Sequence, residues 1–230
     1  MTSRSAVVLV AMEEEAAPFL ARADEVSEPV RIGRAVHRGI VVDGRTHVLV
    51  QTGIGMVNGA NAAAGALARY GDDVHLISAG SAGGLAKGVE VGDVIVSDSL
   101  VNVGADARTF GYALGQVPGM PVAYDGDPEL RRALLAARVG LTVREGSVGS
   151  GEAFVTAELA ARLREDFPHL LAVDMESAAI AQVAHNHGTR FVSVRAVSDL
   201  CAPDGTEFLT HVDDAAERSA RLVVDALAAL

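Results

Sequence analysis

Short apolar runs alternate with helical stretches along most of this chain, and this alternation restricts its fold more than any other feature. The runs Ala6–Met12, His75–Ala79 and Arg190–Val197 are short and mostly apolar, as is typical of buried strands. The Ala-rich stretch Val57–Tyr70 is followed by Gly71, which predicts a helix that ends at a glycine. The alternation therefore predicts an α/β fold in which a largely parallel central sheet lies between two layers of helices.

Three further segments refine this expectation. The runs Val36–Val42 and His47–Gln51 flank the dipeptide Asp43-Gly44, which predicts an antiparallel hairpin and hence a mixed sheet. The segment Asn102–Asp127 is rich in Gly and Pro and has no clear period, so it predicts a long loop with a functional or interface role. Apolar positions from Leu209 to Leu227 predict a final amphipathic helix. Without a linker, repeat or low-complexity tract, residues 1–230 are expected to form a single three-layer α/β/α domain.

Composition limits the partners of such a domain. Half of the 230 residues are hydrophobic and only 4% are aromatic, so Ala, Val, Leu and Ile must form the core, and the apolar excess predicts an additional buried surface such as a homodimer interface. The formal net charge of −11 repels a phosphate backbone, which argues against nucleic acid and anionic membranes as partners. We therefore expect a small-molecule substrate and a second copy of the chain.

Cysteine, histidine and hydropathy patterns bear on metals and localisation. Cys201 is the only cysteine, so an intrachain disulfide and a Cys-rich zinc site are excluded, and the seven His residues show no zinc-binding spacing. No apolar run approaches the ~18 residues of a membrane span. The run Ala6–Met12 follows Arg4 as in a short signal peptide, but acidic residues stand where a cleavage site would need small ones. We expect a cytoplasmic protein without a bound metal or organic cofactor.

Glycines and carboxylates follow the predicted strands directly. Ligands of open α/β sheets bind beyond the carboxyl ends of strands, where glycines let the backbone approach a ligand and carboxylates can act as acids or bases. The segments at these ends are Met12–Glu15, Thr52–Gly55, Gly80–Gly84, Ser150–Phe154, Val173–Glu176 and Arg195–Asp199. Several carboxylates on one rim without metal-type His spacing suit chemistry on a neutral polyol or glycoside better than on a phosphate.

Each of these features also has a purely structural interpretation. Three Glu residues at a helix start favour the helix dipole, and Asp199 or Glu176 could cap or begin a helix. The loop Gly80–Gly84 lacks the lysine of a P-loop and the spacing of a dinucleotide fingerprint. Phe154 is compatible with a core position, and spacing alone does not decide between these interpretations.

Taken together and in order, the motifs resemble the 5′-methylthioadenosine/S-adenosylhomocysteine nucleosidases of the nucleoside phosphorylase/hydrolase superfamily. The resemblance runs from Ala6 to about Leu227. The motifs that carry it are Ala11–Glu15, Thr52–Gly55, Gly80–Leu85, Ser150–Phe154, Met175-Glu176 and Arg195–Asp199, with looser matches at Phe110–Tyr112 and Gln116–Gly119. The resemblance implies hydrolysis of the N-glycosidic bond of 5′-modified adenosines with release of adenine.

The resemblance also implies roles for matching positions. Glu15 corresponds to the general base that activates water, and Asp199 to the general acid at adenine N7, oriented by Ser198. This suits glycosidic cleavage, in which an oxocarbenium-like transition state is attacked from the face opposite the protonated leaving group. The implied substrate-binding residues are Met175 and Glu176 at the ribose, Phe154 and Val155 at adenine, Met12, Ile54, Ser81 and Gly83 along the pocket, and Phe110 and Pro118, which reach across a dimer interface to the 5′-substituent.

Three departures qualify the resemblance. Met56 stands where many relatives have Lys, and Asp174 replaces a more usual Glu before Met175-Glu176, which shortens a carboxylate behind the site. The segment 102–108 matches poorly, so the resemblance specifies the reaction better than the 5′-substituent.

Three alternatives stay open at this level. A futalosine-type nucleosidase would use the same scaffold with another 5′-group. A phosphorylase would carry Arg three residues before Ser81, where this chain has Ser78. A non-catalytic nucleoside-binding protein would not need Glu15, Glu176 and Asp199 together.

Overall fold

The computed structural model describes residues 4–137, 139–201, 205–228 and 230. The strands are β1 (Ala6–Val10), β2 (Glu25–Val26), β3 (Val30–Ile32), β4 (Ala35–Val42), β5 (Arg45–Gln51), β6 (His75–Gly84), β7 (Val94–Asn102), β8 (Tyr124–Asp125), β9 (Val143–Ser150), β10 (Leu170–Asp174) and β11 (Arg190–Asp199). The helices are α1 (Glu13–Arg22), α2 (Met56–Tyr70), α3 (Pro128–Ala136), α4 (Ala157–Asp166), α5 (Ser177–His187) and α6 (Thr206–Leu227), with a short 3₁₀ helix at Arg108–Phe110.

The central sheet is mixed, as predicted. Its strands follow the order β10-β9-β7-β11-β6-β1-β5-β4-β2. β1 runs parallel to both β5 and β6, and β6 runs parallel to β11. The hairpin of β4 and β5 is antiparallel, and its turn residues Asp43 and Gly44 have φ values of 49° and 73°, which a tight hairpin turn requires. The carboxyl ends of β1, β5, β6 and β11 therefore lie along one edge.

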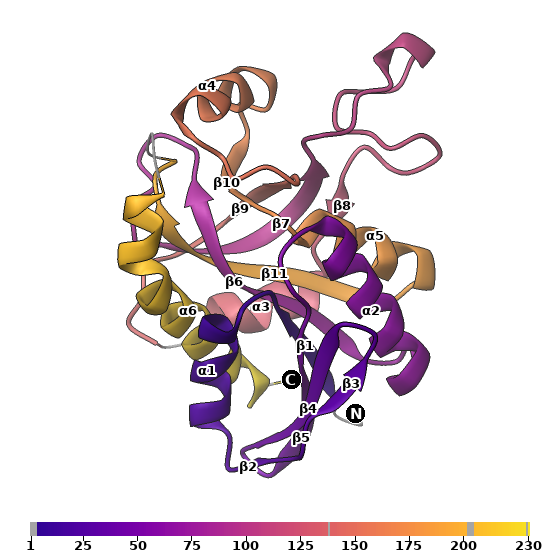
Figure 1. The fold of residues 1–230 in the computed structure, drawn as a ribbon, viewed down its shortest axis with the longest axis vertical. Coiled ribbons are helices and arrows are strands. Elements are labelled where there is room, and N and C mark those ends of the chain that lie inside the picture. The colour runs from indigo at the N-terminus through magenta and orange to yellow at the C-terminus, as the bar shows by residue number, and fades with distance from the viewer. Residues whose placement is uncertain (1–3, 138, 202–204, 229) are drawn as a thin grey trace.

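Two helical layers cover the sheet, and β1 shows why. Successive side chains of a strand point to opposite faces. Val8 and Val10 pack in a core cluster with residues of α1, α3 and α6, whereas Val7 and Leu9 pack in a second cluster with residues of α2 and α5. Figure 1 shows α1 and α6 on one side of the sheet and α2 and α5 on the other. The predicted three-layer α/β/α architecture is confirmed.

The glycine-rich segment after His75–Ala79 is a strand, and the expectation of a loop at Gly80–Gly84 is wrong. β6 continues through these glycines, pairs with β11 along its length and meets β10 in antiparallel register at Gly83 and Gly84. Their missing side chains allow this crowded course, because a Cβ at Gly80 would lie 2.6 Å from the carboxyl carbon of Glu15. The site edge is thus built from extended backbone.

Other segments are largely as predicted. The segment from 103 to 123 contains only the 3₁₀ helix and an isolated bridge between Asp106 and Leu114, and it forms an arm that projects from the body (Figure 1). Helix α4, which covers the end of the sheet near β9 and β10, was not anticipated. No helix in the described ranges is long and apolar enough to cross a membrane.

Candidate active site

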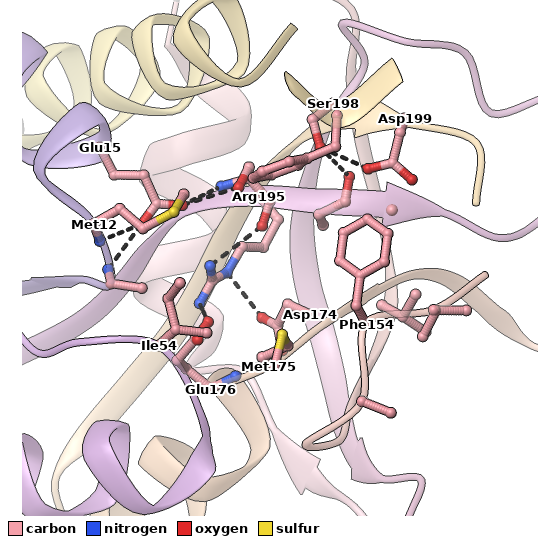
Figure 2. Close-up of a pocket in the computed structure, with 18 residues that line it drawn as sticks. Met12, Glu15, Ile54, Phe154, Asp174, Met175, Glu176, Arg195, Ser198 and Asp199 are labelled. Carbon is pink, nitrogen blue, oxygen red and sulfur yellow. Dashed lines mark hydrogen bonds and ion pairs between the residues drawn. The ribbon is translucent and has the colours of Figure 1, made fainter. Parts of the chain in front are cut away.

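A pocket opens where β1, β5, β6, β10 and β11 end (Figure 2). Its lining residues are Ala11, Met12, Glu15, Ile54, Ser81, Ala82, Gly83, Ala153, Phe154, Val155, Val173, Asp174, Met175, Glu176, Arg195, Ser198, Asp199 and Phe208. Eleven of the thirteen residues selected from the sequence are in this set. The fold therefore brings into one cavity residues that lie far apart in the sequence, from Ala11 to Phe208.

Glu15 is turned inward at the start of α1 and is only 1% exposed. One carboxylate oxygen accepts hydrogen bonds from the amides of Ala11 (2.7 Å) and Met12 (3.2 Å). The other accepts from the amide (2.9 Å) and hydroxyl (3.0 Å) of Ser81. Glu13 and Glu14 are exposed. The helix-dipole interpretation therefore fits Glu13 and Glu14, whereas Glu15 is held at the pocket by four donors.

Asp199 is the last residue of β11 and is 4% exposed. A bulge between Val197 and Asp199 shifts the pairing with β6, and bulges re-aim side chains at strand ends. The carboxylate accepts hydrogen bonds from the Ser198 hydroxyl and from the amide of Cys201, each at 2.9 Å. Burial raises the pKa of Asp199 above its ordinary value, and these two hydrogen bonds oppose the rise.

The interpretation of Asp199 as a helix cap is wrong. The next helix, α6, begins at Thr206 and its N-cap is Gly205. The hydrogen bonds of the Asp199 side chain go to its immediate neighbours in the pocket wall instead.

Glu176 does occupy the N-cap position of α5, but its side chain makes no capping hydrogen bond. It accepts from the amide of Gly55 at 2.9 Å and lies 3.4 Å from the guanidinium of Arg195. Burial raises the pKa of Glu176 to about 7; Arg195 opposes this shift, while the carboxylates of Asp174 and Glu15 add to it. Glu176 is therefore a carboxylate whose charge is finely balanced near neutral pH.

Arg195 joins these acidic groups, and sequence reasoning gave it no role. It is 2% exposed and is the only Arg or Lys buried in the part of the chain that the structure describes. Its Nε lies 2.8 Å from Asp174 Oδ2. Burial alone would lower its pKa, but the carboxylates of Asp174, Glu176 and Glu15 outweigh burial and raise it. Arg195 is a permanent cation at the centre of the pocket floor.

A group of hydroxyls completes the floor behind Arg195. The Nη2 of Arg195 donates to the Ser78 hydroxyl at 2.7 Å and to the Ser177 hydroxyl at 3.1 Å. Ser177 and Ser150 both donate to the Asp174 carboxylate. Asp174, noted as a shortened carboxylate, therefore still reaches Arg195 and is fixed by two serines.

The far wall of the pocket is apolar. Phe154 packs edge-on against Phe208 with ring centroids 5.8 Å apart and planes at 75°. Phe154 is 43% exposed, so it borders the pocket opening and is not a core residue. Figure 2 places Phe154 near Asp199, whereas Met12 and Ile54 stand on the side of Glu15. A planar apolar group fits beside Phe154.

Phe110 and Pro118 do not line this pocket. Both lie on the projecting arm, where Phe110 is 80% exposed and Pro118 is also exposed. Their expected contribution across a dimer interface stays a prediction.

The chemistry available here is proton transfer around a bound neutral molecule. Two buried carboxylates, Glu15 and Asp199, lie on different sides of the cavity (Figure 2). Within the described ranges, no cluster of three or more His, Cys, Asp or Glu side chains could hold a metal ion. The arrangement is one that separates an acid from a base.

The chain is similar to known proteins over nearly its full length. The sequence model of the phosphorylase superfamily matches residues 5–228. A 5′-methylthioadenosine/S-adenosylhomocysteine nucleosidase of Geobacillus thermodenitrificans is 39% identical over 227 residues, which cover 96% of this chain and 95% of that protein.

Solved structures agree with this match. The 5′-methylthioadenosine/S-adenosylhomocysteine nucleosidase of Neisseria meningitidis, in complex with methylthio-immucillin-A, superposes with a TM-score of 0.93 at 36% identity and covers 99% of this chain and 100% of that one. The futalosine hydrolase of Helicobacter pylori superposes with a TM-score of 0.91 at 24% identity, covering 99% of each chain. At that identity the second likeness concerns the fold alone.

Proposed function

The chain belongs to the phosphorylase superfamily and, within it, to the 5′-methylthioadenosine/S-adenosylhomocysteine nucleosidases, which are N-glycosyl hydrolases, and we propose that it hydrolyses the N-glycosidic bond of 5′-thio-substituted adenosines. The observation that carries this proposal is the pair of buried carboxylates, Glu15 and Asp199, in contrasting environments. Glu15 accepts hydrogen bonds from four N–H and O–H donors, which hold its carboxylate at the pocket. Asp199 has a raised pKa because it is buried, which favours the protonated acid.

The proposed reaction uses both groups. Asp199 donates its proton to adenine N7 while the bond between N9 and C1′ breaks, and the bonding electrons leave with adenine. A water molecule attacks C1′ of the oxocarbenium-like sugar, and Glu15 takes the proton that the water loses. Each positioned acid or base is typically worth about 10²–10⁴ in rate.

The other pocket residues have binding roles in this proposal. Phe154 stacks on adenine and Val155 lies beside it, with Ser198 orienting Asp199 through the 2.9 Å hydrogen bond. Glu176, held by Arg195 and by the amide of Gly55, binds the ribose hydroxyls next to Met175. The remaining lining residues of the sequence prediction are Met12, Ile54, Ser81 and Gly83.

Water, not phosphate, is the proposed nucleophile. Ser78, which stands at the position where phosphorylases carry Arg, is fully buried and accepts a hydrogen bond from Arg195. Arg195 is itself paired with Asp174 and Glu176. A phosphate dianion would find no uncompensated cation there and would meet the charge of Glu15.

We further propose that residues 1–230 form a single nucleosidase domain that acts in the cytoplasm as a homodimer. The exposed Phe110 on the projecting arm supports the dimer, because a large aromatic side chain at such a position is typical of an interface.

A hydrolysis panel tests the proposal. Purified protein should release adenine from 5′-methylthioadenosine and from S-adenosylhomocysteine at a rate that does not depend on added phosphate. Formation of a ribose-1-phosphate product would support a phosphorylase instead, and preferred cleavage of aminofutalosine would support a futalosine-type enzyme. Tight binding of nucleosides without release of adenine would indicate a binding protein.

A further inference from the structure

A second, larger hollow adjoins the pocket, and none of the residues given a catalytic role lies in it. This groove has a volume of about 1190 Å³ and shares Ala11, Met12 and Ile54 with the pocket. One wall is the first turns of α1, and the other is the face of the sheet formed by β3, β4 and β5. The remaining lining residues are Glu13, Glu14, Ala16, Ala17, Leu20, Pro29, Arg31, Arg34, Val36, Arg38, Gln51, Gly53 and Asn58.

Strand register brings the arginines of this groove together. Arg31 on β3 pairs with Val36 on β4, and Val36 pairs with Gln51 on β5, so these side chains share one face. Arg38 lies two residues after Val36 on the same strand and therefore points to the same side. Arg34 follows from the turn between β3 and β4, and its Nε lies 3.1 Å from where a Cβ of Gly53 would stand. Three guanidinium groups thus line one groove of a chain whose net charge is −11.

The charged side chains of this groove have no partner among the other described residues. Among the described residues, Arg31, Arg34 and Arg38 form no ion pair or hydrogen bond through their guanidinium groups, and the carboxylates of Glu13 and Glu14 on the opposite wall form none either. Positive and negative groups therefore face the same space without neutralising each other. Such a surface is complementary to a ligand that carries both charges.

The proposed binding mode of the nucleoside directs its 5′-substituent toward this groove. Adenine lies at Phe154 and Asp199 and the ribose at Glu176, so the 5′-carbon faces the remaining side of the pocket, where Met12 and Ile54 stand (Figure 2). A substituent longer than a methyl group passes these two residues and enters the groove. The apolar side chains of Leu20, Pro29 and Val36 can cover its methylene groups.

We propose that the groove between α1 and the β3–β4 hairpin binds the α-amino-acid end of a 5′-thioether substituent, with its carboxylate at Arg34 and Arg38 and its ammonium group at Glu13 and Glu14. The proposal rests on the nucleosidase function proposed above and makes S-adenosylhomocysteine, which carries such a zwitterion, the substrate favoured over 5′-methylthioadenosine, which ends in a methyl group.

The test compares four substrates that share the adenosine and the thioether. 5′-Methylthioadenosine carries no charge, S-adenosylhomocysteine carries both, and 3-carboxypropyl and 3-aminopropyl thioethers carry one each. In the double variant Arg34→Gln/Arg38→Gln, KM for the two carboxylate-bearing substrates should rise about 10-fold relative to KM for 5′-methylthioadenosine, because charge-assisted hydrogen bonds are lost from a partly solvated site. Glu14→Gln should raise KM about 3-fold for the two ammonium-bearing substrates.

Controls separate the possible failures. Arg132→Gln removes an exposed arginine of α3, remote from both cavities, and should leave all four KM values unchanged. If the arginine variants change all four substrates equally, or none, the proposed groove is wrong while the nucleosidase function stands. If the unaltered protein releases adenine from no substrate, the nucleosidase function itself is wrong. If light scattering shows that Arg34→Gln/Arg38→Gln changes the oligomeric state, the groove is an interface between copies and the proposal is overturned.

Discussion

At the scale of single residues, Glu15 shows how one carboxylate can serve both the fold and the chemistry. Its two oxygens accept four hydrogen bonds, and all of the donors are N–H or O–H groups. An amide in the same place keeps one acceptor but turns an NH₂ group toward donors. Replacement by Gln therefore removes the proposed base and also leaves backbone amides without an acceptor.

We expect Glu15→Gln to lower kcat by at least about 10²-fold and to lower the free energy of unfolding by about 1–3 kcal/mol. Steady-state adenine release and thermal unfolding measure the two effects. Glu158→Gln is a matched control, because Glu158 is an exposed acidic residue in the first turn of α4. Turnover of Glu15→Gln close to that of the unaltered protein would place the base elsewhere, with Glu176 as the first candidate.

Asp199 should set the alkaline limb of the pH profile. Its pKa is raised by burial, so the protonated acid persists to higher pH than in an ordinary Asp, and kcat/KM should fall as pH rises through this raised pKa. Asp199→Asn should lose about 10²–10⁴ in turnover and should lack this limb, while ligand binding falls far less. Exposed Asp213 on α6 provides the control Asp213→Asn. An alkaline limb that survives in Asp199→Asn would assign the acid to another group.

Glu176 should make stability depend on pH. Its pKa in the folded protein, about 7, lies above the ordinary value of 4.5, so the folded state binds the proton more tightly than the unfolded state. The stability that this proton contributes is complete below pH 4.5 and is lost as pH rises toward and through 7. A shift of this size corresponds to something on the order of 3 kcal/mol at alkaline pH.

Glu176→Gln cannot titrate, so its melting temperature relative to the unaltered protein should be higher at pH 8 than at pH 5. Calorimetry at the two pH values measures this difference. The same variant should lose activity at both, because the proposed ribose contact is gone. An equal difference in melting temperature at pH 5 and pH 8 would contradict the proposed titration of Glu176.

At the scale of secondary-structure elements, the local sequence pattern predicted the elements that carry their own turn or end signals. The hairpin at Asp43-Gly44 and helix α2 ending at Gly71 carry turn and stop signals, and both form as predicted. The extended course of β6 beyond Ala79 was missed because it depends on neighbours. Its glycines are accommodated by pairing with β11 and β10 and by the nearby Glu15 carboxylate, which no local pattern reveals.

The sequence likewise predicted some residues of the candidate site and missed others. The residues that end strands were recognisable because glycines and carboxylates directly follow apolar runs. The role of Arg195 was not, because it depends on Asp174 and Glu176, which come from another strand end. Phe208 was missed since helical periodicity pointed to Leu209, yet Leu209 is 75% exposed and Phe208 packs on Phe154.

Strand β6 gives a prediction at this scale. Gly80 has a φ of 147° and no space for a side chain, because a Cβ would overlap the Glu15 carboxylate. We expect Gly80→Ala to destabilise the protein by about 1–3 kcal/mol and to remove most activity by displacing Glu15. Gly88→Ala is the control, since Gly88 also has a positive φ of 81° but nothing lies near its Cβ position. Thermal unfolding and adenine release test both, and full activity in Gly80→Ala would show that Glu15 need not be held in place.

At the scale of the whole molecule, one chain leaves part of its apolar surface uncovered. Phe110 is 80% exposed on the projecting arm, and Val57 on α2 and Ile54 at the pocket edge are 76% and 51% exposed. Met12 and Ile54 line the pocket on the side of Glu15 (Figure 2). Association of two chains would bury such surfaces and could close the pocket with the partner's arm.

We therefore expect light scattering to give twice the chain mass of 23.7 kDa, about 47 kDa, at working concentration. Phe110→Asp places a charge on the proposed interface, so it should weaken the dimer and raise KM for 5′-methylthioadenosine, whose methylthio group would lose the covering arm. Lys87→Asp changes an exposed charge elsewhere and should alter neither mass nor KM. Because the arm would act on the partner's pocket, mixing Phe110→Asp with the inactive Glu15→Gln should create mixed dimers with one complete pocket. The pocket of the Phe110→Asp chain keeps Glu15 and is covered by the intact Phe110 of the other chain, whereas the second pocket lacks both residues. Activity at low substrate concentration should consequently rise above that of either variant alone, while staying below that of the unaltered protein. An active monomer in light scattering would show that the pocket functions without a second copy, and a Phe110→Asp variant with unchanged mass and KM would show that Phe110 neither holds the interface nor covers the pocket.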